Sequence, residues 1–320
     1  MGKMRAIVCT KYGPPEVLQL REVEKPTPKD DEVLIKIHAT AVTASDIFIR
    51  GSQIPIQFLI PMRLYIGLTR PRKSIIGLVL AGEIEAVGKD VKRFRVGDQV
   101  YGLTGFGLGT YAEYKCMKET DSFHGCLAMK PVNVTYEEAT MAAYGGLLAF
   151  QYVEKGNIQR GQKVLIYGAS GTSGTMAVQL AKYLGAEVTA VCSSTNLELV
   201  KSLGADAMID YTKVDTVEPG VQYDFMLDAV GKAKTSKLKI ACKKALAPNG
   251  KCVSIDDGKL MLDSKRLASI KELVEAGHIK PVIDKCFRFE EMVEAHRYVG
   301  KGHKKGGVAV SVARSSKDSL

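Results

Sequence analysis

The sequence predicts an α/β protein in which a β-rich domain is followed by a doubly wound parallel sheet. Short strand-like segments separated by Gly and Pro turns fill the first 127 residues. Helical and strand patterns alternate from residue 128 to residue 277, which is typical of a parallel sheet covered by helices. A glycine-rich turn joins one such strand to a helix at residues 168–174. The length of 320 residues suits two domains.

The N-terminal domain is expected to span residues 1–127 and to be completed by residues 278–320. Turns are indicated by Gly13–Pro15 and Lys25–Pro28, and the chain is expected to return through 281–284. The expected strands are 5–9, 17–22, 33–41, 81–88, 96–102, 111–117 and 308–312, with a helix at 290–298.

The second domain is expected to span residues 128–277, with its strands and helices in alternation. The expected strands are 163–167, 187–192, 207–210, 223–229 and 251–255, and the expected helices are one from Thr135, 176–184, 197–203, 234–246 and 264–276. This order is that of a Rossmann domain.

The glycine turn is the most informative motif of the chain. Gly168 is suited to a tight turn, Gly171 to close approach of a diphosphate, and Gly174 to packing of the helix on the strand. The helix N-terminus offers backbone N–H groups and a partial positive charge to a phosphate. The candidate cofactor-binding residues of this turn are Gly168, Ala169, Ser170, Gly171, Thr172, Ser173 and Gly174. The spacing G-x-x-G-x-x-G differs from the common G-x-G-x-x-G, so an ordinary βα turn is the alternative.

The end of the second Rossmann strand favours NADPH over NADH. An Asp or Glu there normally binds the ribose 2′-hydroxyl of NADH, but residues 192–196 hold no carboxylate. The hydroxyl groups of Ser193, Ser194 and Thr195 are suited to a 2′-phosphate. The segment from Thr195 to Glu198 is also expected to form a helix capping box.

Composition limits the location and the partners. Seven cysteines without a C-x-x-C pair, and no signal peptide, indicate free thiols and a cytoplasmic protein. The apolar segment 54–68 is too short to span a bilayer, and is expected to cover an apolar pocket, with a peripheral membrane contact as the alternative. The net charge of +10 comes from dispersed lysines without a nucleic-acid-reading motif, so nucleic acid is not the expected partner.

Several segments taken in order resemble one family over nearly the whole chain. They are Lys11–Leu18, Ala81–Gly88, Phe94–Val100, the glycine turn, Ser202–Asp206, Ile209–Tyr211, Tyr223–Gly231, Pro281–Asp284 and Glu294–Tyr298. Together they resemble the zinc-independent quinone oxidoreductase (zeta-crystallin-like) branch of the medium-chain dehydrogenase/reductases. The resemblance implies a GroES-like catalytic domain, a Rossmann domain, NADPH in the cleft between them, and hydride transfer to quinones or α,β-unsaturated carbonyl compounds.

The residues at the family's zinc positions argue against a metal. Catalytic zinc requires three protein ligands. Thr43 stands where zinc alcohol dehydrogenases have a ligand Cys, and Leu78 stands in place of the His of their Gly-His-Glu. Cys116 and Cys126 alone cannot form a four-cysteine structural site. No zinc is therefore expected, and a zinc alcohol dehydrogenase is a third alternative.

The resemblance also implies site residues, for each of which simple packing is the alternative. Thr43 and Asp46 begin the helix that borders the nicotinamide, and Tyr144 lies on the opposite helix of the cleft. These three are the candidate catalytic residues. Val230 and Gly231 end the fourth Rossmann strand near the nicotinamide ribose.

Some residues depart from the family pattern and keep alternatives open. Tyr211 matches a tyrosine of the family that packs beside the adenosine 2′-phosphate. Two other positions differ from the family: Leu148 replaces a usual Thr, and Val79 replaces a usual acidic residue. These departures favour the alternative of a non-catalytic NADPH-binding sensor or nucleic-acid-binding protein. The segment between Ile255 and Ser264 is shorter than in many relatives, which leaves a homodimer as an open expectation. The sequence identifies neither the acceptor nor the proton donor.

Overall fold

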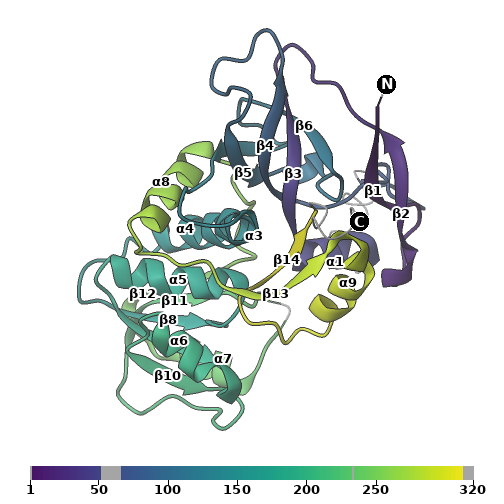
Figure 1. Ribbon diagram of the computed structural model, residues 1–320. Coiled ribbons are helices and arrows are strands. Elements are labelled where there is room, and N and C mark those ends of the chain that lie inside the picture. Colours follow the sequence, from purple (N-terminus) through teal and green to yellow (C-terminus); the bar gives the residue numbers. More distant parts are fainter. Residues whose placement is uncertain (1, 52–65, 233, 313–320) are drawn as a thin grey trace. The chain divides into compact units, whose positions relative to one another are not determined.

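The computed structural model describes residues 2–51, 66–232 and 234–312 (Figure 1). Its contacts divide the chain into two compact units, which are described separately. The first holds Met1–Ala143, Leu262–Ala268 and Ile283–Leu320, and the second holds Tyr144–Met261 and Ser269–Val282.

The first unit contains helix α3 (Tyr136–Met141), which packs on strands of the large sheet of that unit. The expected boundary at residue 127 assigns this helix to the second domain. The contacts therefore place residues 128–143 in the first unit, whereas the expected boundary places them in the second domain. The N-terminus of α3 is a capping box, in which Thr135 Oγ1 accepts from Glu138 N and Glu138 Oε2 accepts from Thr135 N.

The large sheet of the first unit has seven strands in the order β13-β14-β3-β4-β5-β7, with β6 also paired to β3. Their bounds are β3 Glu32–Val42, β4 Val79–Val87, β5 Gln99–Leu103, β6 Tyr114–Lys118, β7 Cys126–Met129, β13 Ile283–Arg288 and β14 Gly307–Ser311. The C-terminal strand β14 pairs antiparallel with β3, so the end of the chain completes the N-terminal sheet. The β-rich domain that the sequence predicts is confirmed.

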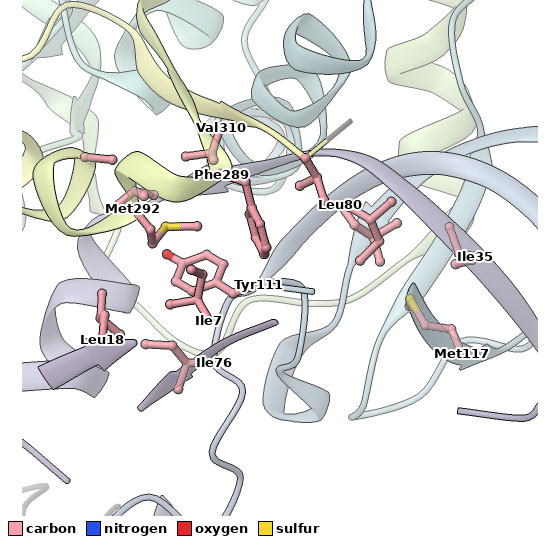
Figure 2. Close-up of a cluster of buried hydrophobic side chains, with 14 of the residues drawn as sticks. Ile7, Leu18, Ile35, Ile76, Leu80, Tyr111, Met117, Phe289, Met292 and Val310 are labelled. Atoms are coloured by element: carbon pink, nitrogen blue, oxygen red, sulfur yellow. The ribbon is translucent and has the colours of Figure 1, made fainter. Parts of the chain in front are cut away.

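A two-stranded sheet and two longer helices complete the first unit. Strands β1 (Lys3–Cys9) and β2 (Leu18–Glu24) pair antiparallel, and the helices are α1 (Ala44–Gly51) and α9 (Met292–Gly300). Figure 2 shows the apolar core of this unit, where Ile7, Tyr111, Phe289 and Met292 lie together. Residues far apart in the sequence therefore meet in one buried cluster.

The second unit contains a five-stranded parallel sheet in the order β10-β9-β8-β11-β12. The strands are β8 Lys163–Tyr167, β9 Glu187–Cys192, β10 Ala207–Asp210, β11 Tyr223–Asp228 and β12 Leu246–Ser254. The helices are α4 Leu147–Glu154, α5 Thr172–Tyr183, α6 Leu197–Ser202 and α7 Lys237–Lys244, and α8 Ser264–Glu275 contributes residues to both units. The doubly wound sheet is confirmed. Its order reverses between β8 and β11, which is where such sheets bind ligands at the carboxyl ends of the strands.

Within the described part of the chain, no helix is long and apolar enough to cross a membrane. The expectations for segment 54–68 concern residues that lie mostly outside the described ranges.

Candidate cofactor site and active site

The glycine turn begins directly where β8 ends. Gly168 has a φ of +83°, a conformation that favours glycine. The backbone N–H groups of Gly168 and Ala169 both donate to Val191 O at 3.0 Å, which ties the turn to β9. Gly171 is the N-cap residue of α5 and provides no side-chain cap. The first turn of α5 therefore begins at the carboxyl edge of the sheet, beside the point where the strand order reverses.

The three glycines of the turn have different steric surroundings. A β-carbon on Gly174 would lie 2.2 Å from the carbonyl oxygen of Gly168, and a β-carbon on Gly168 would lie 2.5 Å from Val230 Cγ2. A β-carbon on Gly171 would meet one atom, Gly168 O, at 3.5 Å. Gly168 and Gly174 thus allow close packing of the protein itself, whereas Gly171 lies beside open space of the kind that a diphosphate requires.

The loop after β11 lies against the glycine turn. Ala229 N donates to Tyr167 O at 2.9 Å, and the backbone N–H groups of Val230 and Gly231 each donate to Asp228 Oδ1 at 3.2 Å. Gly231 has a φ of +92°. The structure therefore brings Val230 and Gly168, two predicted cofactor residues from separate strands, into direct contact.

The hydroxyl-rich segment after β9 is connected to the glycine turn by a residue that the sequence analysis missed. Asn196 Nδ2 donates to Ser170 Oγ and to Ser193 Oγ, both at 3.1 Å. Ser193 Oγ lies 3.1 Å from Thr195 Oγ1. The expected capping box from Thr195 to Glu198 is wrong, because α6 has Asn196 as its N-cap residue and no side-chain cap. Residues 194–196 instead form a 3₁₀ turn.

The structure brings a carboxylate to this edge that the linear sequence does not place there. Asp210 ends β10 in register with Cys192, and its Oδ2 accepts a short hydrogen bond from Ser194 Oγ. Thr212 Oγ1 donates to Asp210 Oδ1 at 2.6 Å. Hydrogen bonds from Ser194 and Thr212 lower the pKa of Asp210 to about 2. Residues 192–196 hold no carboxylate, as the sequence shows, but Asp210 reaches the same edge from β10.

Two further side chains follow Asp210 at the same edge. Tyr211 N donates to Cys192 O at 3.1 Å, and half of the Tyr211 residue surface is exposed. Lys213 Nζ lies 3.8 Å from Asp210 Oδ2 and is largely exposed. A positive charge thus accompanies the carboxylate, beside the predicted position of the adenosine 2′-phosphate.

In the first unit, Thr43 and Asp46 form a closed pair at the start of α1. Asp46 Oδ2 accepts from Thr43 Oγ1 at 2.6 Å and from Thr43 N at 2.8 Å, and Asp46 N lies 3.3 Å from Thr43 Oγ1. This reciprocal arrangement is that of a helix cap, and both residues are buried. Burial, opposed by the hydrogen bonds from Thr43, raises the pKa of Asp46 to about 7.

The surroundings of Asp46 contain three groups that sequence reasoning did not assign. Tyr111 OH lies 3.0 Å from His296 Nε2, and Figure 2 shows the Tyr111 ring among apolar side chains. Burial, assisted by the charge of Arg50, lowers the pKa of His296 to about 3. Burial and the neighbouring Asp46 carboxyl raise the pKa of Tyr111. No local pattern predicts this cluster, because its members come from α1, the loop before β6, and α9.

Tyr144 belongs to the second unit, whereas Thr43 and Asp46 belong to the first. It lies in a π-helical turn, Ala142–Gly146, of the kind that often occurs at functional sites. A β-carbon on the adjacent Gly145 would lie 2.6 Å from Thr172 O, so this turn closely approaches the start of α5.

Among the residues that the structure describes, no group of three or more His, Cys, Asp or Glu side chains could hold a metal ion. All seven cysteines are free thiols. Burial raises the pKa of Cys116 to about 11 and that of Cys126 to about 12, so both thiols are protonated at neutral pH in the metal-free protein.

Comparison with known families matches both parts of the chain. Residues 29–127 match the alcohol dehydrogenase GroES-like domain, and residues 174–278 and 259–310 match two zinc-binding dehydrogenase families. Among solved structures, the quinone oxidoreductase from Coxiella burnetii is 26% identical and superposes with a TM-score of 0.84, covering 98% of this chain and 100% of that one. An NAD-dependent alcohol dehydrogenase is 28% identical with a TM-score of 0.81, covering 97% and 100%.

Three curated relatives match nearly the whole chain. The 2-methylene-furan-3-one reductase of Solanum lycopersicum is 32% identical over 97% of this chain and 79% of its own. The chloroplastic NADPH-dependent alkenal/one oxidoreductase of Arabidopsis thaliana is 30% identical over 96% and 79%, and a chloroplastic quinone oxidoreductase of Triphysaria versicolor is 32% identical over 96% and 98%. Because such relatives match both domains in the same order, this protein belongs to the medium-chain dehydrogenase/reductase superfamily.

Proposed function

We propose that this protein is a zinc-independent, NADPH-dependent oxidoreductase that transfers hydride to a quinone or an α,β-unsaturated carbonyl compound. The observation that carries the proposal is the open space beside Gly171 at the N-terminus of α5, next to the switch point of the sheet. The printed names of the reductases from Solanum, Arabidopsis and Triphysaria support the reaction class.

The residues of the second unit are suited to hold the cofactor. The backbone of residues 168–174 would bind the pyrophosphate, Val230 and Gly231 the nicotinamide ribose, and Ser193, Ser194, Thr195 and Tyr211 the adenosine end. When bound, the reduced nicotinamide supplies the hydride. The protein's own contribution is to hold the two reactants together and to exclude water from them.

NADPH rather than NADH is the preferred cofactor in this proposal. Its support is the NADPH dependence in the name of the Arabidopsis relative, together with the donors Ser193 and Thr195 and the exposed cation of Lys213. Asp210 opposes that preference, because it accepts the hydrogen bond of Ser194 and repels a phosphate. The preference is therefore expected to be moderate rather than absolute.

Thr43 and Asp46 are proposed to supply the proton. The enolate or quinolate oxygen would take the proton that Thr43 Oγ1 otherwise donates to Asp46, and a protonated Asp46 would return one to Thr43 with their hydrogen bond reversed. The 2.6 Å hydrogen bond between these oxygens and a pKa of about 7 for Asp46 suit this relay near neutral pH. Asp46 is then reprotonated from solvent. Tyr144 is proposed to contact the acceptor.

Three further properties belong to the proposal. The apolar and hydroxyl side chains at the family's zinc positions, Thr43 and Leu78, favour activity without zinc. The free thiols favour a cytoplasmic location. The partner is a small molecule, and a homodimer is a hypothesis that sedimentation or size-exclusion measurements would test.

The test is a titration with NADPH and NADH, followed by turnover with a panel of naphthoquinones and enones. Tighter binding of NADPH and oxidation of NADPH by at least one acceptor class are expected. Binding without turnover across the panel, accompanied by salt-sensitive nucleic-acid binding that NADPH displaces, would instead support the non-catalytic alternative.

A further inference from the structure

A buried ion pair lies at the carboxyl end of β11, among residues that have no role in the proposal above. Asp228 is 0% exposed and Lys239, on α7, is 3% exposed. Lys239 Nζ lies 2.6 Å from Asp228 Oδ2. Lys and Asp are rarely buried to this degree, and each then needs an opposite charge and a full set of hydrogen bonds.

The pair meets most of those requirements through the residues that follow β11. The Lys239 ammonium donates to Gly231 O and Lys234 O, both at 2.7 Å, and it contacts Asp228 Oδ2 as an ion pair, although that oxygen accepts no hydrogen bond. Asp228 Oδ1 accepts from the backbone of Val230 and Gly231 at 3.2 Å. The two charges therefore contact the backbone of Val230, Gly231 and Lys234 from the buried side.

The same network reaches the glycine turn. Ser236 Oγ accepts from Lys239 N at 3.1 Å and lies 2.8 Å from Tyr167 OH. Lys239 Nζ lies 5.6 Å from the centroid of the Tyr167 ring, and Tyr167 is the residue immediately before Gly168. The segments on both sides of the switch point thus share one connected set of polar contacts, which is buried at Asp228 and Lys239 and reaches the surface at Ser236.

We propose that Asp228 and Lys239 are positioning residues for the nicotinamide half of the cofactor. This inference rests on the proposed function, in which Val230 and Gly231 border the nicotinamide ribose. Neither charged side chain needs to touch the cofactor. Replacing either residue leaves the other charge buried without a partner, and replacing Lys239 also releases the carbonyl groups of Gly231 and Lys234. Val230 and Gly231 then lose contacts that fix their backbone.

The experiment compares two ligands on four variants of the full chain. The variants are Lys239→Met, Asp228→Asn, the double variant, and Lys182→Met as a matched control. Lys182 pairs with Asp206 at 2.7 Å in the same unit but is partly exposed. The ligands are NADPH and adenosine 2′-phosphate 5′-diphosphate, which lacks both the nicotinamide and its ribose. The dissociation constant of each ligand, the melting temperature, and kcat and KM with a naphthoquinone are measured.

Each single variant is expected to bind NADPH about tenfold more weakly and to lose about tenfold or more in kcat, because the reacting ring is misplaced. Binding of adenosine 2′-phosphate 5′-diphosphate stays within about twofold, as do both affinities of the Lys182 variant. If a single variant does not fold, the double variant, which buries no unpaired charge, decides the same comparison.

Two results would overturn the inference: unchanged NADPH affinity, or an equal loss for both ligands, which would indicate a purely structural pair. Failure of the proposed function has a different signature. If the wild-type protein binds NADPH but reduces no acceptor, the proposed reaction is refuted. The effect of each variant on the affinity for NADPH, compared with its effect on the affinity for the shorter ligand, still decides the role of Asp228 and Lys239. A wild-type protein that binds neither ligand refutes both proposals.

Discussion

Alanine substitutions at Gly171 and Gly174 should have opposite consequences, although the two residues lie three positions apart in one turn. At Gly174 the new β-carbon would lie 2.2 Å from Gly168 O and 2.8 Å from the Cα and carbonyl carbon of Ala169. Ordinary contact begins at 3.4 Å, so the helix and the strand must separate by about 1.2 Å. Every atom in the clash belongs to the backbone, so no rotamer change relieves it.

The energetic cost follows from that overlap. Overpacking of a close contact costs about 1–3 kcal/mol or more, and the better helix propensity of Ala returns about 1 kcal/mol. Because the clash is with backbone, the cost lies at the upper end of that range, and we expect Gly174→Ala to cost about 1–2 kcal/mol in total. That corresponds to a melting temperature lowered by about 2–8 °C.

Gly171→Ala should leave the fold nearly intact and weaken cofactor binding. Its β-carbon would make one ordinary contact at 3.5 Å, and the backbone φ of −79° and ψ of 176° suit alanine. Exchanging Gly for Ala at an N-cap costs about 0.5 kcal/mol, or roughly 1–2 °C. The methyl group would occupy the space proposed for the pyrophosphate and remove one or two charge-assisted hydrogen bonds, which weakens NADPH binding about 10- to 100-fold.

The assay combines thermal unfolding with titration of NADPH followed by its own fluorescence, since the chain contains no Trp. Gly300→Ala is the control, because a β-carbon there meets no atom within 4 Å. The reasoning is refuted if Gly174→Ala melts within about 1 °C of the wild type. It is also refuted if Gly171→Ala lowers the melting temperature as far as Gly174→Ala does and leaves NADPH affinity unchanged.

Three further predictions concern charge and metal. The pKa of Asp46 is raised from 3.8 to about 7, so protonation of Asp46 stabilises the folded state. The free energy of unfolding should therefore fall by roughly 2–4 kcal/mol as the pH rises from about 4 to above 7. Denaturant titrations of Asp46→Asn should lack that decline, and an equally steep decline would contradict the assignment. Asp210→Asn should raise the ratio of NADPH affinity to NADH affinity by about three- to tenfold, most clearly at low salt, and an unchanged ratio places the 2′-phosphate elsewhere. Dialysis against a chelator should leave quinone reductase activity unchanged, and elemental analysis should find well below one zinc ion per chain. Loss of activity that added zinc restores would favour the alcohol dehydrogenase alternative.

The sequence alone determined the features that depend on local chemistry. The Gly168–Gly174 turn, the helix after it and the parallel strands are set by glycine spacing and hydrophobic periodicity, both of which are read along the chain. The family resemblance placed Thr43 and Asp46 at the start of one helix, and the structure shows that these residues, three positions apart, form a helix-capping contact.

Only the tertiary structure decided which distant charges meet. Asp210 reaches Ser194 because β10 lies parallel to β9, a register that residues 192–196 do not encode. Asp46 acquires its high pKa from burial, and Lys239 finds Asp228 because α7 returns to the end of β11. Burial and the identity of neighbouring strands are properties of the folded chain. The strength of an electrostatic interaction depends on both, whereas hydrophobic periodicity can be read along the sequence. The sequence therefore predicts a cofactor turn, and the fold decides which charges surround it.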